Sequence, residues 1–155
     1  MQTVLIVDDD PAFLQTLEKM LVTAGYKVLR AVDGTQAVDI LEKNNKEIDL
    51  AIVDLALPGI NGFEIIGALS RRPNPVKIIA TTSIYKDAHL AMAGTLGAHA
   101  AIRKPPPGRP LPERDWLSTV QRLIGNSETD KLTNAARVSG ARNDSEPSNE
   151  TKAKQ

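Results

Sequence analysis

Short apolar runs recur along the chain, and polar or turn residues bound each of them. Three runs have the length of buried strands, at residues 4–7, 50–53 and 78–80. Central strands of a parallel sheet are covered on both faces, so they are apolar at nearly every position rather than at alternate ones. Two further segments, 26–31 and 100–103, contain basic residues and suit the edges of a sheet. The pattern predicts five strands, with the apolar ones in the middle.

Apolar residues with helical spacing lie between these strands. The clearest set begins after Asp10, a helix-capping residue, has Pro11 in its first turn and ends near Gly25. Its apolar positions are Phe13, Leu14, Leu17, Met20 and Leu21. Weaker helical patterns are found after Gly34, after Asn61, over residues 87–96 and over residues 116–124.

Strands and helices therefore alternate from one end of the pattern to the other. Such alternation predicts an α/β fold, a doubly wound (βα)5 domain with a parallel five-stranded sheet and right-handed crossovers. Placing the two basic strands outside gives the strand order 2-1-3-4-5, the flavodoxin-like winding. Ligands of such sheets bind where the winding reverses, so functional residues are expected just after Val7 and Val53.

Composition excludes several classes of function. Lys plus Arg equal Asp plus Glu at 19 each, so no basic field favours direct binding of nucleic acid. Cysteine is absent, which excludes disulfides, thiolate metal sites and a cysteine nucleophile. No segment reaches membrane-spanning length, and the apolar start lacks a basic leader. We therefore expect a cytoplasmic protein that does not contact a membrane.

The composition changes after Gly125 to small and polar residues without a regular period. We expect one domain over residues 1–125 and a disordered tail over residues 126–155. We therefore expect no DNA-binding or catalytic output domain.

Aspartates follow two of the apolar strands. Asp8, Asp9 and Asp10 come directly after the first strand, and Asp54 follows the third. Carboxylates placed together resist joint ionisation unless a cation lies among them, and hard oxygen ligands select Mg²⁺, with Mn²⁺ as a second possibility. Asp10 is interpreted as a helix cap. Solvated loop residues are the alternative for Asp8 and Asp9, but that interpretation leaves their place opposite Asp54 a coincidence.

A lysine and a threonine follow the other two strands that face this crevice. Lys104 comes just after the fifth strand, where its long side chain reaches toward a carboxylate or phosphoryl oxygen. Thr82 ends the fourth strand and offers a hydroxyl, although a threonine that merely favours strand structure is an equal alternative on local grounds. A carboxylate nucleophile, a cation site, a lysine and a hydroxyl are suited to moving a phosphoryl group onto Asp54.

With these motifs, residues 3 to about 125 resemble the receiver domain of response regulators in two-component signalling, of the single-domain, chemotaxis-regulator type. The resemblance includes the acidic opening at residues 8–10, the loop from Asp54 to Gly62, the pair at residues 82–83 and Lys104 followed by Pro105. It implies Asp54 as the phosphoacceptor, supplied by a histidine kinase or a histidine phosphotransfer protein, and an output protein that the sequence does not identify.

The resemblance also implies roles for single residues. Asp9, Asp54 and the backbone carbonyl of Ala56 would be Mg²⁺ ligands, with Asp8 acting largely through bound water. Thr82 and Lys104 would hold the phosphoryl oxygens. The family's bond between this lysine and its proline is typically cis, so a cis bond is expected before Pro105.

Three positions depart from the family pattern. Ala101 stands where the family usually has a Tyr or Phe that moves inward with the threonine. Ala56 and Ile84 flank the path of the hydrolytic water, and neither side chain can orient it, so slow self-dephosphorylation is expected.

His89, His99 and Trp116 are interpreted as surface or packing residues.

Two other functions stay open. The segment Asp8-x-Asp10 resembles the opening of haloacid-dehalogenase-type phosphatases, but Pro11 and Ala12 stand where that motif needs Gly and Thr. A receiver-like interaction module that no longer needs phosphate is the second alternative, favoured by Ala101 and the proline-rich residues 105–112. As a receiver, the chain is not an enzyme beyond its own phosphoryl transfer and dephosphorylation.

Overall fold

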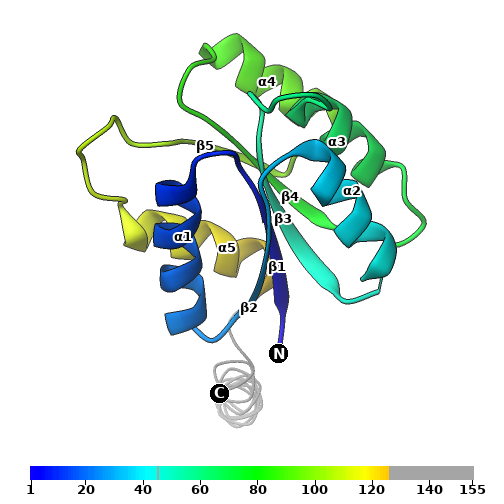
Figure 1. Cartoon of the computed structure of the whole chain (residues 1–155), viewed down its shortest axis with the longest axis horizontal. Helices are drawn as coiled ribbons and strands as arrows, with labels where there is room; N and C mark the ends of the chain where they lie inside the picture. The colour runs from blue at the N-terminus through cyan, green and yellow to red at the C-terminus, as the bar shows by residue number, and fades with distance from the viewer. Residues whose placement is uncertain (45, 126–155) are drawn as a thin grey trace, which may run out of the picture. The chain divides into compact units, whose positions relative to one another are not determined.

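Five parallel strands form one sheet in the order β2-β1-β3-β4-β5 (Figure 1). They are β1 (Thr3–Val7), β2 (Lys27–Ala31), β3 (Ile48–Asp54), β4 (Lys77–Thr82) and β5 (Ala100–Arg103). The predicted fold class and strand order are confirmed. The computed structural model describes residues 1–44 and 46–125, so the tail expected over residues 126–155 lies outside the described residues.

Helices cover both faces of the sheet. They are α1 (Pro11–Thr23), α2 (Gly34–Lys43), α3 (Gly62–Ser70), α4 (Asp87–Leu96) and α5 (Glu113–Ile124). Helices α1 and α5 pack on one face, and α2, α3 and α4 lie on the other (Figure 1). In the part of the chain that the structure describes, no helix is long and apolar enough to cross a membrane.

Each central strand contributes side chains to two separate apolar clusters. In β1, Leu5 and Val7 pack with the α2–α4 side, while Val4 and Ile6 pack with the α1–α5 side. All four are fully buried. Side chains of a strand alternate between its faces, so a strand covered by helices on both sides must be apolar throughout.

Helix α1 begins where the sequence predicts. The side chain of Asp10 accepts hydrogen bonds from the backbone N–H groups of Ala12 and Phe13, which caps the helix. Trp116 of α5 is fully buried, and its ring meets that of Phe13 edge to face with 5.7 Å between centroids. The interpretation of Trp116 as a packing residue is confirmed.

The expected cis bond before Pro105 is wrong, because no peptide bond within the described residues is cis. The chain reverses later instead, in a turn where the N–H of Arg109 donates to the carbonyl of Pro106 at 3.1 Å and Gly108 has a φ of +82°. A turn at that point leaves Pro105 free to keep the trans form, which X–Pro bonds favour by about 0.5–1 kcal/mol.

Gly62 allows α3 to approach the end of β3. A Cβ atom on Gly62 would lie 2.1 Å from the carbonyl oxygen of Asp54 and 2.6 Å from the Cα of Leu55. Both atoms are backbone, so neither can move aside without displacing the strand end. The loop that follows Asp54 is therefore held by a helix that contacts it without an intervening side chain.

We expect Gly62→Ala to lower the free energy of unfolding by about 1–3 kcal/mol, because the added methyl group overpacks the α3–β3 contact. Gly94→Ala in α4 is the matched control, since its Cβ would meet nothing within 4 Å. That change should stabilise the protein by about 0.5–1 kcal/mol through helix propensity. Urea unfolding measures both, and equal effects at the two positions would contradict the close approach.

Candidate functional site

Carboxylates from the ends of β1 and β3 meet at one edge of the sheet. Val7 pairs with Val53 in the parallel register, so Asp8 and Asp54 come next to each other as the strands end. Carboxylate oxygens of Asp8, Asp9 and Asp54 all lie within 4.8 Å of one another. Asp8 and Asp54 are buried and Asp9 is exposed. The prediction that these three aspartates lie close together is confirmed.

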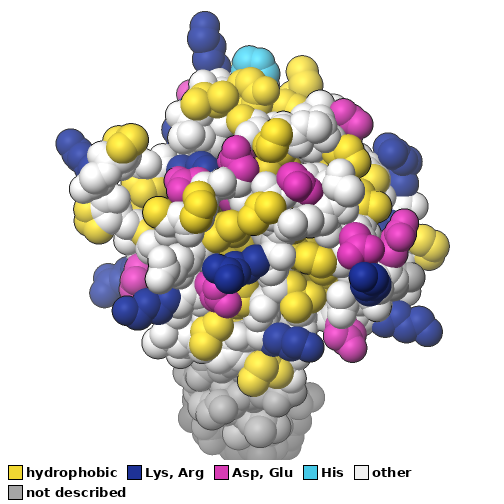
Figure 2. All heavy atoms as spheres, viewed as in Figure 1, with side chains coloured by type: hydrophobic (Ala, Val, Ile, Leu, Met, Phe, Trp, Pro, Cys, Tyr) yellow, Lys and Arg dark blue, Asp and Glu magenta, His cyan; other side chains and the backbone are white. Residues whose placement is uncertain are grey.

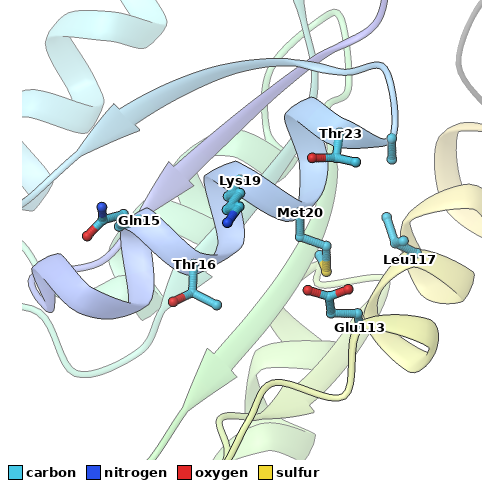
Figure 3. Close-up of a pocket in the computed structure, with 8 residues that line it drawn as sticks. Gln15, Thr16, Lys19, Met20, Thr23, Glu113 and Leu117 are labelled. Atoms are coloured by element: carbon cyan, nitrogen blue, oxygen red, sulfur yellow. The ribbon is translucent and has the colours of Figure 1, made fainter.

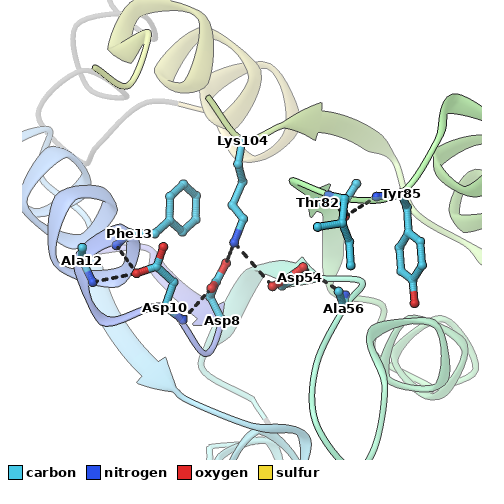
Figure 4. A network of polar contacts seen from close by, with 10 residues as sticks. Asp8, Asp10, Ala12, Phe13, Asp54, Ala56, Thr82, Tyr85 and Lys104 are labelled. Atoms are coloured by element: carbon cyan, nitrogen blue, oxygen red, sulfur yellow. Dashed lines mark hydrogen bonds and ion pairs between the residues drawn. The ribbon is translucent and has the colours of Figure 1, made fainter. Parts of the chain in front are cut away.

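Lys104 reaches both buried carboxylates from the end of β5. Its Nζ donates to Oδ2 of Asp8 at 2.7 Å and to Oδ2 of Asp54 at 3.4 Å (Figure 4). The second oxygen of each carboxylate accepts from backbone: the N–H of Asp10 donates to Asp8, and the N–H of Ala56 donates to Asp54. Each oxygen of the buried pair therefore has a donor.

Burial raises the pKa of both carboxyl groups, and a neighbouring aspartate charge adds to the rise in each case, Asp8 for Asp54 and Asp9 for Asp8. Burial is the largest cause for Asp54, and with the charge of Asp8 it raises the pKa to about 6, although the Ala56 N–H and Lys104 act in the opposite direction. Burial also raises the pKa of Asp8 above its usual value, despite the hydrogen bond from Lys104. For Lys104, burial alone would lower the pKa, but the bond to Asp8 and both carboxylate charges raise it above the usual value.

The donor set fits a divalent cation. Asp8, Asp9 and Asp54 are hard oxygen donors that converge within coordination range, and Lys104 supplies a single positive charge against them. A cation with two charges would remove the repulsion that remains, and an all-oxygen set favours Mg²⁺ or Mn²⁺. The N–H of Ala56 faces Asp54, and the role of the Ala56 carbonyl stays a prediction.

Thr82 lies beside this cluster but its hydroxyl is engaged elsewhere. Asp54 pairs with Thr81 in the β3–β4 register, which places Thr82 at the same edge of the sheet, fully buried. Its Oγ1 accepts from the backbone N–H groups of Ile84 and Tyr85, both at 3.2 Å (Figure 4). The hydroxyl thus stabilises the turn after β4.

The remaining singled-out residues lie apart from the carboxylates. Ala101 is an exposed residue of β5. The ring of His89 stacks on that of Tyr85 in the α4 region with 4.8 Å between centroids. Nδ1 of His99 accepts from the N–H of Ile78, next to the start of β5. Their interpretation as surface or packing histidines is confirmed.

Sequence reasoning missed one neighbour of Lys104. Phe13 was assigned to the buried face of α1, and its ring also lies beneath the ammonium of Lys104, with 4.7 Å from Nζ to the ring centroid. Helical spacing gives no sign of this contact, because it depends on the path of a side chain that comes from another strand.

An open groove of about 650 Å³ lies between α1 and α5, away from the acidic cluster (Figure 3). Its lining includes Lys19, Glu113 and Leu117, and none of the residues that line it belongs to the carboxylate site.

Basic and acidic side chains are interspersed on the face that Figure 2 shows, so that face presents no patch of one sign.

Comparison with known proteins agrees with this geometry. Residues 4–114 match the family model described as the response regulator receiver domain. The response regulator GtcR of Aneurinibacillus migulanus is 33% identical over 67% of this chain, and the aligned part is 42% of that protein. The chain therefore spans less than half the length of this curated relative.

Two solved structures share the fold. A CheY-like receiver domain protein from Methanospirillum hungatei is 27% identical, with a TM-score of 0.70 over 80% of this chain and 94% of its own. The chemotaxis protein CheY4 of Vibrio cholerae is 28% identical, with a TM-score of 0.70 over 80% of this chain and 99% of its own.

The raised pKa of Asp54 predicts a pH dependence of stability in metal-free protein. Between the usual aspartate pKa and about 6, the folded state binds more protons than the unfolded state, so this group's contribution to stability falls as pH rises through that window. We expect Asp54→Asn, which cannot ionise, to raise the urea midpoint of chelator-treated protein more at pH 7 than at pH 5.

Burial, and secondly the charge of Lys77, lower the pKa of His99. The contribution of His99 to stability therefore rises with pH, opposite to that of Asp54. The comparison of wild type with Asp54→Asn at each pH cancels that contribution. An Asp54→Asn effect that is equal at pH 5 and pH 7 would contradict the buried, repelled carboxylate.

Proposed function

Since this chain belongs to the response regulator receiver domain family, we propose that Asp54 is phosphorylated in the cytoplasm by a histidine kinase or histidine phosphotransfer protein of a two-component phosphorelay. The observation that supports the proposal best is the convergence of Asp54, two further aspartates and Lys104 at one sheet edge. A carboxylate with a nearby ammonium and an acidic metal-binding set is suited to phosphoryl transfer.

In the proposed reaction, a carboxylate oxygen of Asp54 attacks the phosphorus of a phosphohistidine. A P–O bond forms as the P–N bond breaks, the leaving imidazole nitrogen keeps the electron pair, and a proton from water completes the neutral ring. Lys104 then offsets the charge of the phosphoryl oxygens on the new acyl phosphate. Its distance of 3.4 Å from the Asp54 carboxylate supports this role.

Asp9, Asp54 and the carbonyl of Ala56 would hold Mg²⁺ directly, and Asp8 through water. When bound, the cation would supply charge neutralisation among the carboxylates and polarise the phosphoryl oxygens.

Thr82 would link phosphorylation to a partner-binding face. A hydroxyl donates one hydrogen bond and accepts two, so Thr82 can donate to a phosphoryl oxygen while it still accepts from Ile84 and Tyr85. Movement of Thr82 would then draw the turn after β4 with it. Because Ala101 supplies no ring, this turn is the proposed route of the switch, and the output protein would bind the surface from Ser83 through α5.

Incubation with Mg²⁺ and acetyl phosphate tests the proposal. We expect intact-mass measurement to show one phosphoryl adduct on the wild-type chain, because acetate can leave as the imidazole would. Asp54→Asn should show no adduct, and neither should wild type with a chelator. Asp39→Asn, at an exposed position in α2, is the matched control and should label like wild type.

The alternatives give different outcomes. Absence of an adduct on folded wild-type protein would favour the phosphate-independent interaction module. Repeated release of phosphate from a phosphomonoester, rather than one adduct per chain, would favour a phosphatase. Neither alternative has support in the family model or in the relatives described above.

Slow self-dephosphorylation remains a prediction from Ala56 and Ile84. Neither side chain has a polar atom to orient the attacking water, and Ile84 is 69% exposed. We expect Ala56→Asn to shorten the lifetime of the adduct several-fold, and Ala56→Val to leave it unchanged. Intact mass after removal of acetyl phosphate measures the lifetime, and a longer-lived adduct in Ala56→Asn would contradict the prediction.

A further inference from the structure

The Lys104 ammonium contacts an aromatic ring as well as two carboxylates. Its Nζ lies 2.7 Å from Asp8, 3.4 Å from Asp54 and 4.7 Å from the centroid of the Phe13 ring (Figure 4). The Lys104 side chain is only 7% exposed. The ring therefore covers part of an ammonium that water would otherwise solvate, and its negative face attracts the charge.

Phe13 is itself held in place from two sides. Its backbone N–H donates to the capping side chain of Asp10, so the residue is fixed to the first turn of α1. Its ring packs edge to face against Trp116, which is fully buried. A ring supported in this way is a rigid boundary for Lys104 rather than a flexible neighbour.

We propose that Phe13 is a positioning residue for phosphoryl transfer to Asp54, acting through Lys104. The ring confines the Lys104 side chain to the crevice and disfavours conformations that point into solvent. The Lys104 ammonium is then already near Asp54 when the phosphoryl group arrives. This proposal rests on the proposed function. With acetyl phosphate, a P–O bond to Asp54 forms, the donor P–O bond breaks, and acetate leaves with the electron pair while Lys104 offsets the phosphoryl charge.

The first test compares two substitutions that both keep a large side chain at position 13. Phe13→Leu removes the aromatic face, and Phe13→Tyr retains it. Typical cation–π energies correspond to rate differences of roughly 3- to 30-fold. We expect Phe13→Leu to be phosphorylated more slowly by that factor at saturating Mg²⁺, and Phe13→Tyr to restore a rate close to wild type. Intact mass over minutes to hours measures the rates.

The second test separates positioning from a purely structural role by a double-mutant cycle. If Phe13 acts through Lys104, Phe13→Leu should change the rate less than two-fold in a Lys104→Ala background. An equal slowing by Phe13→Leu in both backgrounds would mean that the ring only supports the fold, which overturns the proposal. Trp116 is the sole tryptophan, so unfolding curves from its fluorescence show that each variant is folded.

Failure of this proposal and failure of the proposed function are distinguishable. A wild-type chain that takes no phosphoryl group contradicts the proposed function. A wild-type chain that labels, together with a Phe13→Leu chain that labels equally fast, contradicts the role of Phe13 alone.

Discussion

Asp8 and Asp54 lie side by side in the protein interior, and the repulsion between them constrains everything at this end of the sheet. Asp8 is fully buried and Asp54 is 3% exposed. Two desolvated carboxylates can both ionise only if positive charge and hydrogen-bond donors face them. Lys104 supplies the charge, and the N–H groups of Asp10 and Ala56 supply the donors. These partners follow three different strands. The charges and donors that compensate the two carboxylates are therefore brought together by the strand order.

The compensation is incomplete, and this leaves the site able to respond. One ammonium faces two buried carboxylates and the exposed Asp9, so a negative charge remains that a divalent cation would offset. A phosphoryl group would add about −1.5 to −2 charge at Asp54. Lys104 could then no longer serve Asp8 and Asp54 as it does now, because its single charge would be drawn to the phosphoryl oxygens. If the carboxylate charges were fully compensated, a phosphoryl group would change the contacts of Lys104 less.

The sequence predicts this site because the carboxyl ends of parallel strands share one edge. Once the apolar runs are assigned as central strands, Asp8 and Asp54 come next to each other at that edge. Lys104 follows β5 at the same edge, and its long side chain reaches them past β4. The contact of Phe13 with Lys104 and the trans bond before Pro105 are not predictable in this way. Both depend on side-chain rotamers and on where a proline-rich loop turns, and residue patterns do not record either.

Two helices on the same face of the sheet, α3 and α4, differ in how firmly they are held near the site. Helix α3 buries five residues and contacts the end of β3 directly through Gly62, whereas α4 buries Ala93 alone. Helices with few buried apolar contacts open or shift at low free-energy cost. The turn after β4, which the Thr82 hydroxyl holds, leads into α4 and not into α3. In the proposed switch, movement of Thr82 would therefore act on the helix with the fewest buried residues, while Gly62 keeps α3 against the end of β3.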